Sequence, residues 1–301
     1  MKISSAAFAT FAVVAAAAHG FPCCVKKPKV PFKFSSSSSN SSRAAAHSSE
    51  RSHHSVTGTT TFGTQKWNGP LVTLSGTNLT LKGNGKLDGQ GYWKQGQQTT
   101  RPVFFQMHKV IHSTVSSFTI MNAPYRTFSI VDSMYTTISG LMLDSRAGNG
   151  VATNTDGFDL SCNDHITITG NTIYNQDDCL AMQSSTNTFF TNNHCYNSHG
   201  ISVGSLGGSA VDRTTTVSGL TVQGNHIHDS DNGLRTKTII GLKGLVTDVK
   251  FIDNEPKREE RYRGPLGLQQ IQGWLYGCGH ESSAEHGRYC LGPYGHSHGS
   301  V

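Results

Sequence analysis

The chain has 301 residues, of which 35% are hydrophobic and only 15% are charged, and it contains 33 glycines. This length suits one large domain or two ordinary ones and is enough to bury a core. The low charge and the short apolar runs exclude a coiled coil and a polytopic membrane protein, and glycine without a three-residue period excludes collagen. A formal net charge of +6 favours an anionic partner but does not distinguish nucleic acid, membrane and acidic polysaccharide.

The N-terminus has the pattern of a secretory signal peptide. Lys2 is followed by a nearly continuous run of small apolar residues from Ala6 to Ala18, and cleavage is expected between about Ala18 and Gly20. The run is too short to cross a membrane as a helix. We therefore expect residues 1–20 to be a signal peptide and the mature protein to be secreted and extracellular.

Secretion makes disulfide bonds plausible. The number of cysteines is odd, so at least one thiol is unpaired or pairs between chains; the seven are Cys23, Cys24, Cys162, Cys179, Cys195, Cys278 and Cys290. Asn40-Ser-Ser and Asn78-Leu-Thr are acceptor sequences for N-glycosylation. We expect a secreted glycoprotein with at least one disulfide.

Composition divides the rest of the chain into three segments. Residues 21–56 are rich in lysine and then in serine, have no hydrophobic period, and are expected to be disordered. Residues 57–255 contain short β-branched and aromatic runs between Gly, Asn and Asp turns, without an amphipathic helix of useful length. Residues 256–301 are charged and then rich in glycine and histidine, and we expect an irregular tail there.

The middle segment repeats itself. Five strand starts align at successive offsets of 30, 22, 21 and 33 residues, namely Phe128-Ser-Ile-Val, Phe158-Asp-Leu-Ser, Leu180-Ala-Met-Gln, Ile201-Ser-Val-Gly and Leu234-Arg-Thr-Lys. A unit of 21 or 22 residues with two insertions is typical of a β-solenoid, whose turns each add one strand to several parallel sheets. A β-sandwich is also rich in turns, but it gives no reason for the same turn sequence to return. We predict an all-β solenoid.

Polar residues occupy one place in successive repeats, two residues before the strand start. Stacking of the turns would place these residues in one column, which contains Asp156, Asp178, His199 and Asn232. Asp177 adds a second carboxylate beside Asp178. Arg235 and Lys237 follow their strand start by one and three positions, so alternation along the strand puts both on the outward face next to the column.

Three carboxylates, an imidazole and two cations are thus expected within a few ångströms of one another. Carboxylates one strand spacing apart, roughly 4.8 Å, repel each other and raise a pKa. General acid–base chemistry needs such a pair, because one carboxyl must hold a proton while another is ionised. The two cations would attract an acidic substrate.

Four motifs in this segment resemble those of the polygalacturonases, glycoside hydrolase family 28. They are Asn154-Thr-Asp-Gly-Phe-Asp159, Asn175-Gln-Asp-Asp-Cys179, Ser198-His-Gly-Ile-Ser-Val-Gly204 and Arg235-Thr-Lys-Thr238. Their order and spacing match too, and the resemblance covers about residues 58–254. It implies a right-handed parallel β-helix that hydrolyses the α-1,4 bonds of polygalacturonate with inversion. The motif sequences are more similar to those of the fungal-type endo-acting enzymes than to those of the exo-acting ones.

The resemblance also implies roles for the acidic residues. Asp177 matches the general acid, Asp156 and Asp178 match the pair that activates water, and His199 matches the histidine that keeps the acid's proton in place. Carboxyl groups one strand spacing apart would ordinarily suggest a retaining glycosidase. Inversion therefore rests on the resemblance and not on the predicted geometry.

The remaining matches concern binding and covalent structure. Arg235 and Lys237 match cations that bind substrate carboxylates, and Asn154 matches a polar residue on the substrate side. Cys179 and Cys195 match a disulfide between adjacent turns. The resemblance implies polygalacturonate or pectin as partner, without a cofactor or metal. Neither nucleic acid nor membrane is expected to bind, and we expect a monomer.

Both ends depart from the family pattern. A Lys/Ser-rich stretch replaces the segment that caps the family's helix, and no tyrosine after Glu255 matches the one that follows the family's Arg-x-Lys motif. Because solenoids need capped ends, the alternative to an active hydrolase is a truncated, inactive or weakly active pectin-binding solenoid. Asp177 and Asp178 as calcium ligands of a lyase are disfavoured by their neighbours His199 and Arg235.

Overall fold

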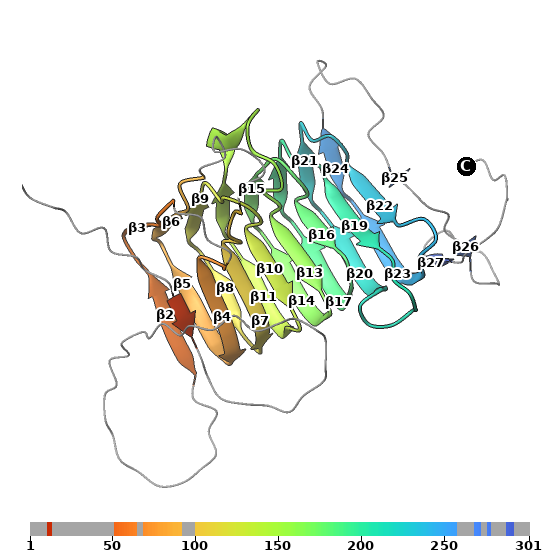
Figure 1. The fold of residues 1–301 in the computed structure, drawn as a ribbon, viewed down its shortest axis with the longest axis horizontal. Helices are drawn as coiled ribbons and strands as arrows, with labels where there is room; N and C mark the ends of the chain where they lie inside the picture. Colours follow the sequence, from red (N-terminus) through yellow and green to blue (C-terminus); the bar gives the residue numbers. More distant parts are fainter. Residues whose placement is uncertain are drawn as a thin grey trace, which may run out of the picture.

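The computed structural model describes residues 51–64, 69–91 and 100–257. It also gives the backbone of four short strands outside these ranges, which are β1 (Phe11–Val13), β25 (Leu268–Ile271), β26 (Tyr276–Gly277) and β27 (Gly287–Leu291). The described turns stack along one axis into a parallel β-helix, with the N-terminal turns at one end and the C-terminal turns at the other (Figure 1). Arg146–Gly148 forms a 3₁₀ turn, η2.

Three ladders of parallel strands run along the helix (Figure 1). Ladder 1 contains β4 (Val72–Thr77), β7 (Phe105–Ile111), β10 (Phe128–Val131), β13 (Phe158–Ser161), β16 (Leu180–Met182), β19 (Ile201–Leu206), β22 (Leu234–Thr238) and β25. Ladder 2 contains β2 (Ser52–Val56), β5 (Leu79–Gly83), β8 (Thr114–Ser116), β11 (Met134–Ser139), β14 (Asn163–Thr169), β17 (Ser185–Thr191), β20 (Thr216–Gln223) and β23 (Gly244–Ile252). Ladder 3 contains β3 (Thr59–Thr61), β6 (Lys86–Asp88), β9 (Thr119–Met121), β12 (Met142–Asp144), β15 (Thr172–Tyr174), β18 (His194–Tyr196), β21 (His226–His228) and β24 (Glu255–Lys257).

The register of ladder 1 confirms the predicted repeat. Phe128 pairs with Phe158, Phe158 with Leu180, Leu180 with Ile201 and Ile201 with Leu234. These are the five strand starts that the sequence aligned, so residues at one place in the repeat lie in one column along the axis. The predicted solenoid fold is therefore correct, and so is the expectation that side chains distant in sequence meet on ladder 1.

Aromatic side chains fill the core beneath ladder 1. Phe105, Phe128 and Phe158 are fully buried, and their stacked rings lie 5.0 and 5.1 Å apart between centroids. Each begins a strand of ladder 1, and every second residue along these strands points into the same core. Stacked rings of this kind stabilise the fold beyond the area they bury, by about 0.5–1.5 kcal/mol per pair.

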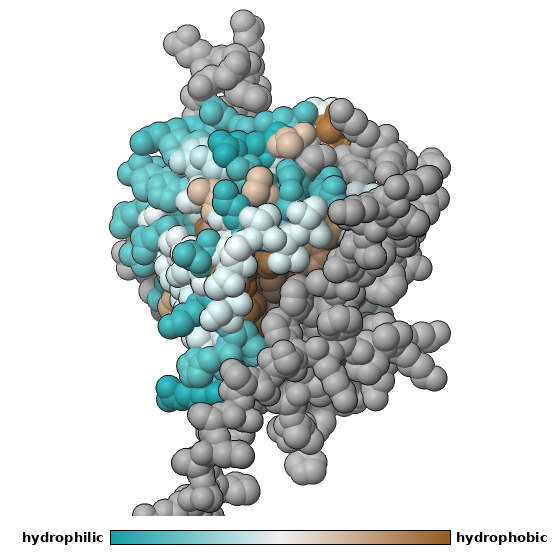
Figure 2. All heavy atoms as spheres, turned by 90° about the vertical axis from the view of Figure 1, so that its left-hand side faces the viewer, coloured by the Kyte–Doolittle hydropathy of each residue, from teal (hydrophilic) through white to brown (hydrophobic). Residues whose placement is uncertain are grey.

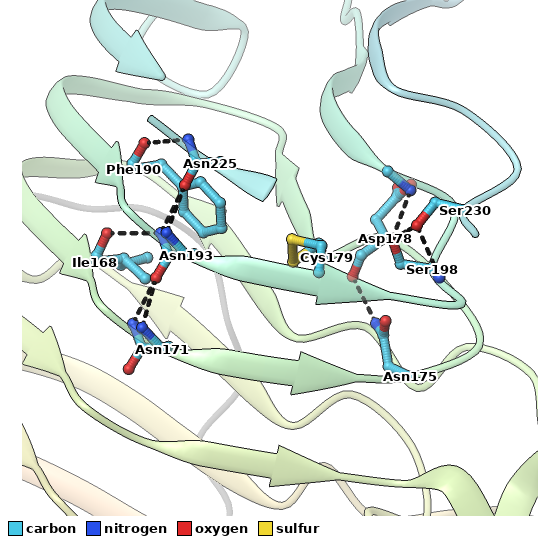
Figure 3. Close-up of a disulfide and its surroundings, with 12 residues drawn as sticks. Ile168, Asn171, Asn175, Asp178, Cys179, Phe190, Asn193, Ser198, Asn225 and Ser230 are labelled. Atoms are coloured by element: carbon cyan, nitrogen blue, oxygen red, sulfur yellow. Dashed lines mark hydrogen bonds between the residues drawn. A yellow bond between two sulfur atoms is a disulfide. The ribbon is translucent and has the colours of Figure 1, made fainter. Parts of the chain in front are cut away.

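Asparagines form a second interior ladder, at the turn between ladders 2 and 3 (Figure 3). Asn171 donates to the side-chain oxygen of Asn193 at 2.9 Å, Asn193 donates to Asn225 at 3.1 Å, and Asn225 donates to Asn254 at 2.8 Å. The same amides donate to strand carbonyls such as that of Ile168. Buried amides are costly unless they are hydrogen-bonded, so this ladder favours one register of the turns.

The helix extends beyond both predicted boundaries. Strand β2 lies inside residues 21–56, which were expected to be disordered, and pairs in parallel with β5. Strand β24 crosses the boundary at residue 255, and β25 in the predicted tail pairs with β22. In β2 only Val56 is buried and in β24 no residue is, so neither segment carries a hydrophobic signal. Residues 21–50 lie outside the described ranges.

The apolar side chains at the N-terminal end of the helix are mostly buried, and β1 pairs in parallel with β4 there. A cavity of about 230 Å³ opens there among the side chains of Val56, Val72, Leu74, Leu81 and Phe105. In the view of this end, the coloured surface is mostly hydrophilic, with a few apolar residues visible near its middle (Figure 2).

Candidate functional site

The turns that lead into ladder 1 hold the predicted column. Backbone hydrogen bonds join one turn to the next: Gly157 N–H donates to Asp178 O at 2.9 Å, Cys179 N–H to Gly200 O at 2.8 Å, and Ile201 N–H to Gly233 O at 2.9 Å. Asp156, Asp178, His199 and Asn232 therefore stand on four successive turns, as predicted. The turn that carries Asp178 also appears in Figure 3, where the Asn175 amide donates to the Asp178 carbonyl at 2.9 Å.

Asp178 is the centre of the site. Its side chain is buried, and its Oδ1 accepts hydrogen bonds from Ser202 Oγ at 2.7 Å and from the Arg235 guanidinium at 2.5 Å. Its Oδ2 accepts from Lys237 Nζ at 2.5 Å. A buried carboxylate is tolerated when it is paired and hydrogen-bonded, and this one has two cations. Both cations face outward from the strand but are mostly covered, with side-chain exposures of 11% and 21%.

Asp177 and His199 form a second pair. His199 Nδ1 lies 3.2 Å from Asp177 Oδ1, and its Nε2 lies 3.4 Å from Asp231 Oδ2. The hydrogen bond to Asp177 raises the pKa of His199, against the effect of burial. Burial raises the pKa of Asp177, but the His199 hydrogen bond and charge, together with the Asp178 N–H, outweigh it and lower the pKa. The proton that the pair shares therefore lies on the imidazole.

Asp156 and Asp159 have raised pKa values and therefore keep their protons to a higher pH than ordinary carboxyl groups. Burial, together with the charges of Asp159, Asp177 and Asp178, raises the pKa of Asp156 to about 8. Burial also raises the pKa of Asp159 to about 7, although Arg126 opposes the shift. The predicted repulsion between carboxylates is thus present, and it acts on Asp156 and Asp159.

The polar residues around the pair position it. Asn154 Nδ2 donates to Asp177 Oδ2 at 3.2 Å, from a backbone at φ +55°, a conformation that asparagine tolerates better than most residues. Gln176 donates to the carbonyl of Ser145 at 2.8 Å and accepts a hydrogen bond from Thr155 Oγ1 at 2.9 Å. These contacts tie the turn that carries Asp177 to the turn N-terminal to it.

A metal ion is a poor fit to these residues. Ligand atoms of Asp177, Asp178 and His199 all lie within 4.8 Å of one another. Both oxygens of Asp178, however, already accept from Ser202 and the two cations, which an ion would have to displace. With cations packed against it, the site suits an anion better than a cation.

The predicted disulfide is present. Cys179 and Cys195 are bonded, with their Cα atoms 6.0 Å apart, and both are buried beside the turn that carries Asp178 (Figure 3). Asn78 lies between β4 and β5, half-buried, with its N–H bonded to Ile111 O at 2.9 Å. Asn40, the other predicted glycosylation site, is outside the described residues, as are Cys23, Cys24 and Cys278 and the side chain of Cys290.

The column continues one turn beyond the residues that the sequence singled out. Arg126 stands two residues before the strand start Phe128, on the turn N-terminal to that of Asp156, and Thr127 N–H donates to Asp156 O at 2.7 Å. Asp159, one position after its strand start, lies beside it. Applying the repeat to the Phe128 unit would have found Arg126, because the same offset defines the column.

The chain matches the family model of the glycosyl hydrolases family 28 over residues 24–259. It belongs to this family. The expectation drawn from the four motifs is therefore correct at family level, and the all-β parallel architecture agrees with it.

Related proteins support the match. Over 205 residues the chain is 43% identical to a polygalacturonase of Saccharomyces cerevisiae, covering 66% of this chain and 56% of that protein. It is 41% identical over 212 residues to a probable endopolygalacturonase B of Aspergillus fumigatus, covering 68% and 57%. The chain thus spans little more than half the length of these relatives.

A solved structure aligns as well. Endopolygalacturonase I from Stereum purpureum, in complex with two galacturonates, superposes with a TM-score of 0.52 at 28% identity, over 67% of this chain and 63% of that one. The endo-xylogalacturonan hydrolase of Aspergillus tubingensis, at 22% identity and a TM-score of 0.62, shares the fold. In the described part of the chain, no helix combines the length and hydrophobicity that crossing a bilayer requires.

Proposed function

We propose that this chain is a secreted, endo-acting hydrolase of the α-1,4-galacturonosyl bonds of polygalacturonate. The observation that carries the proposal is the buried Asp178 carboxylate, held by Arg235 and Lys237 within 4.8 Å of the Asp177–His199 pair. Cleavage of a glycosidic bond needs a carboxyl that donates a proton to the leaving oxygen and a carboxylate on the other side of the bond. The relatives' names, polygalacturonase and endopolygalacturonase, agree with this chemistry.

Asp177 is the proposed general acid, with His199 as its source of the proton. The two pKa shifts by themselves oppose this role, since the pKa of Asp177 is lowered and that of His199 is raised. The two groups titrate as one pair that holds one proton. Transfer of that proton from Nδ1 to Oδ1, across 3.2 Å, leaves a neutral imidazole and a carboxyl that can protonate the glycosidic oxygen.

Asp178 is the proposed base, with Asp156 beside it. Asp178 can accept a proton from water once a bound substrate carboxylate draws Arg235 and Lys237 away from it. Asp156, with a pKa of about 8, is protonated at acid pH, so it can orient a water by a hydrogen bond but not deprotonate it. Inversion of the anomeric centre is part of the proposal and rests on the family resemblance.

Arg235 and Lys237 are the proposed recognition elements for the acidic sugar. Guanidinium groups bind carboxylates with two parallel hydrogen bonds, and an ammonium adds a compact charge. Both cations lie beside the reacting carboxyls, so a galacturonate carboxylate that binds them would place its neighbouring bond at Asp177. The signal-like N-terminal residues support secretion. The Cys179–Cys195 disulfide supports it too, because disulfides form and persist in oxidising compartments.

The test is the release of reducing ends from polygalacturonate by the purified secreted chain, with proton NMR of the fresh product to read its anomeric form. Asp177→Asn should lower kcat by about a hundredfold or more, the range expected for loss of a general acid. A wild-type chain that binds polygalacturonate but releases no ends would instead be the pectin-binding solenoid. Near wild-type activity in Asp177→Asn would remove the assigned acid.

A further inference from the structure

The carboxyl groups of the site have cations on both sides along the helix axis. Arg235 and Lys237 come from β22, two turns C-terminal to the turn of Asp178. Arg126 comes from the turn before β10, two turns N-terminal to it. At one strand spacing per turn, each cation group starts about 10 Å from Asp178. A substrate that carries a carboxylate on every sugar could meet both groups at once.

Arg126 is placed to take part in binding. About a third of its side chain is exposed, and its charge interacts with Asp159, Asp156 and Asp177. Its Nε faces Asp159 Oδ2 at 3.3 Å, yet neither buried atom has a hydrogen bond among the described residues. These two atoms are shielded from solvent, whereas the exposed third of the Arg126 side chain remains accessible to a ligand.

Tyr125 and Arg101 hold this end of the site in place. The Tyr125 ring lies 5.2 Å from the guanidinium carbon of Arg126 and 5.2 Å from that of Arg101, both within cation–π range. Arg101 also donates to Pro124 O at 3.0 Å and to Thr153 O at 2.8 Å. It thus ties the turn of Arg126 to the segment that leads into Asn154 and Asp156.

The charge that faces Arg126 depends on protonation. Asp156 and Asp159 have pKa values raised to about 8 and about 7 by burial, so below these values both are largely neutral. Asp177 remains an anion and is paired with His199. Below pH 7 the guanidinium consequently keeps most of its positive charge for an anion from outside.

We propose that Arg126 binds a substrate carboxylate on the side of the catalytic groups opposite to Arg235 and Lys237, with Tyr125 as its support. This inference rests on the proposed function and adds a second carboxylate contact to it. The two cation groups together select runs of unesterified galacturonate that span the cleavage point. A methyl ester at the sugar facing Arg126 removes the anion and weakens binding there.

The experiment compares three variants at pH 5 on polygalacturonate and on highly methyl-esterified pectin. Arg126→Gln should raise KM for polygalacturonate about tenfold or more, the loss expected for a hydrogen bond to a charged group, with a much smaller change in kcat. Its preference for polygalacturonate over esterified pectin should fall. Arg126→Lys should restore part of the affinity. Arg146→Gln removes the same charge from a residue that contacts Tyr174 on ladder 3, and should leave KM unchanged.

A fourth variant, Asp159→Asn, separates binding from support of the fold. Asp159→Asn removes the carboxyl that faces the guanidinium but keeps the guanidinium itself. Because Asp159 is largely neutral at pH 5, KM for polygalacturonate should stay near the wild-type value in this variant. An increase in KM in both Arg126→Gln and Asp159→Asn would assign the effect to the lost ion pair and overturn the inference. The inference would also be overturned if the wild-type chain is active and Arg126→Gln has the same KM and the same preference for unesterified substrate. The proposed function would still stand in that case.

Failure of the proposed hydrolase function can be told apart from failure of the Arg126 inference. If the wild-type chain releases no reducing ends, the hydrolase proposal is contradicted, and binding of oligogalacturonate by calorimetry becomes the readout. Affinity that Arg126→Gln loses and Arg146→Gln keeps would support the carboxylate contact in a non-catalytic protein. Equal affinity in both variants would overturn it.

Discussion

Lys237 Nζ lies 2.5 Å from Asp178 Oδ2, although the two residues are 59 positions apart in the chain. The contact links strand β22 to the turn before β16, two turns away. Lys237 therefore has two roles: its ammonium is proposed to bind substrate, and it also neutralises the charge of the buried Asp178 carboxylate.

Replacing Lys237 by alanine should therefore affect both binding and stability. We expect KM for polygalacturonate to rise strongly and the free energy of unfolding to fall by about 1–3 kcal/mol, the cost of leaving a buried charged group less satisfied. Initial rates and urea unfolding of the same preparation measure the two effects. Unchanged stability with a raised KM would mean that Arg235 and Ser202 alone suffice for Asp178.

The raised pKa of Asp156 makes stability depend on pH. Its folded value of about 8 lies above the ordinary value of 3.8, so the folded state binds more protons than the unfolded state between these two values. The stabilising contribution is fully present below pH 3.8 and is lost as the pH rises through about 8. Asp156→Asn removes this dependence. We expect its melting temperature minus that of the wild type to increase by about 3 °C or more between pH 4 and pH 8.5. A difference that stays constant with pH would show that Asp156 titrates normally.

The Cys179–Cys195 disulfide should stabilise the turn that bears Asp178. It joins residues 16 apart and fixes Cys179 directly after Asp178. In the chain-entropy model, closing a loop of this size is worth roughly 3 kcal/mol. The double variant Cys179→Ala, Cys195→Ala should unfold at lower denaturant and lose activity before it unfolds. Peptide mapping of unreduced protein checks the bond itself, and two free thiols would contradict the structure.

Protonation of His228, which stacks on the outer face of ladder 3, should make the protein less stable in acid. Tyr174, Tyr196 and His228 stack at 4.5 and 4.8 Å, and His194 stacks on His226 at 4.7 Å. Burial and the neighbouring His226 and Lys257 lower the pKa of His228, so its contribution to stability is present above the ordinary value of 6.5 and is lost as the pH falls.

His228→Tyr continues the tyrosine column and removes that proton site. We expect its melting temperature to exceed the wild-type value by about 2 °C at pH 5, with a smaller difference at pH 8. Differential scanning fluorimetry at both values measures this. An equal gain at the two values would indicate a packing effect rather than titration.

The register of the helix could be predicted from sequence because it follows from the period of the repeat. Phe158, Leu180 and Ile201 begin strands at offsets near 22 residues, and a stacked coil must place equal positions above one another. Asp156, Asp178 and His199 each stand two residues before one of these strand starts, so they also lie above one another. The end strands β2 and β24 could not be found in this way, since their side chains are mostly exposed and carry no hydrophobic signal.

Only the tertiary structure decided how the charges pair. The repeat places Asp178 near two cations and near Asp177, but burial and side-chain reach determine that Arg235 and Lys237 both bind Asp178 while His199 binds Asp177. Burial raises the pKa of Asp156, whereas in Asp177 the His199 hydrogen bond and charge outweigh burial and lower the pKa, and no pattern of residue types specifies either outcome. Electrostatic energies depend on distance and desolvation in three dimensions, whereas a sequence period determines only which residues share a column.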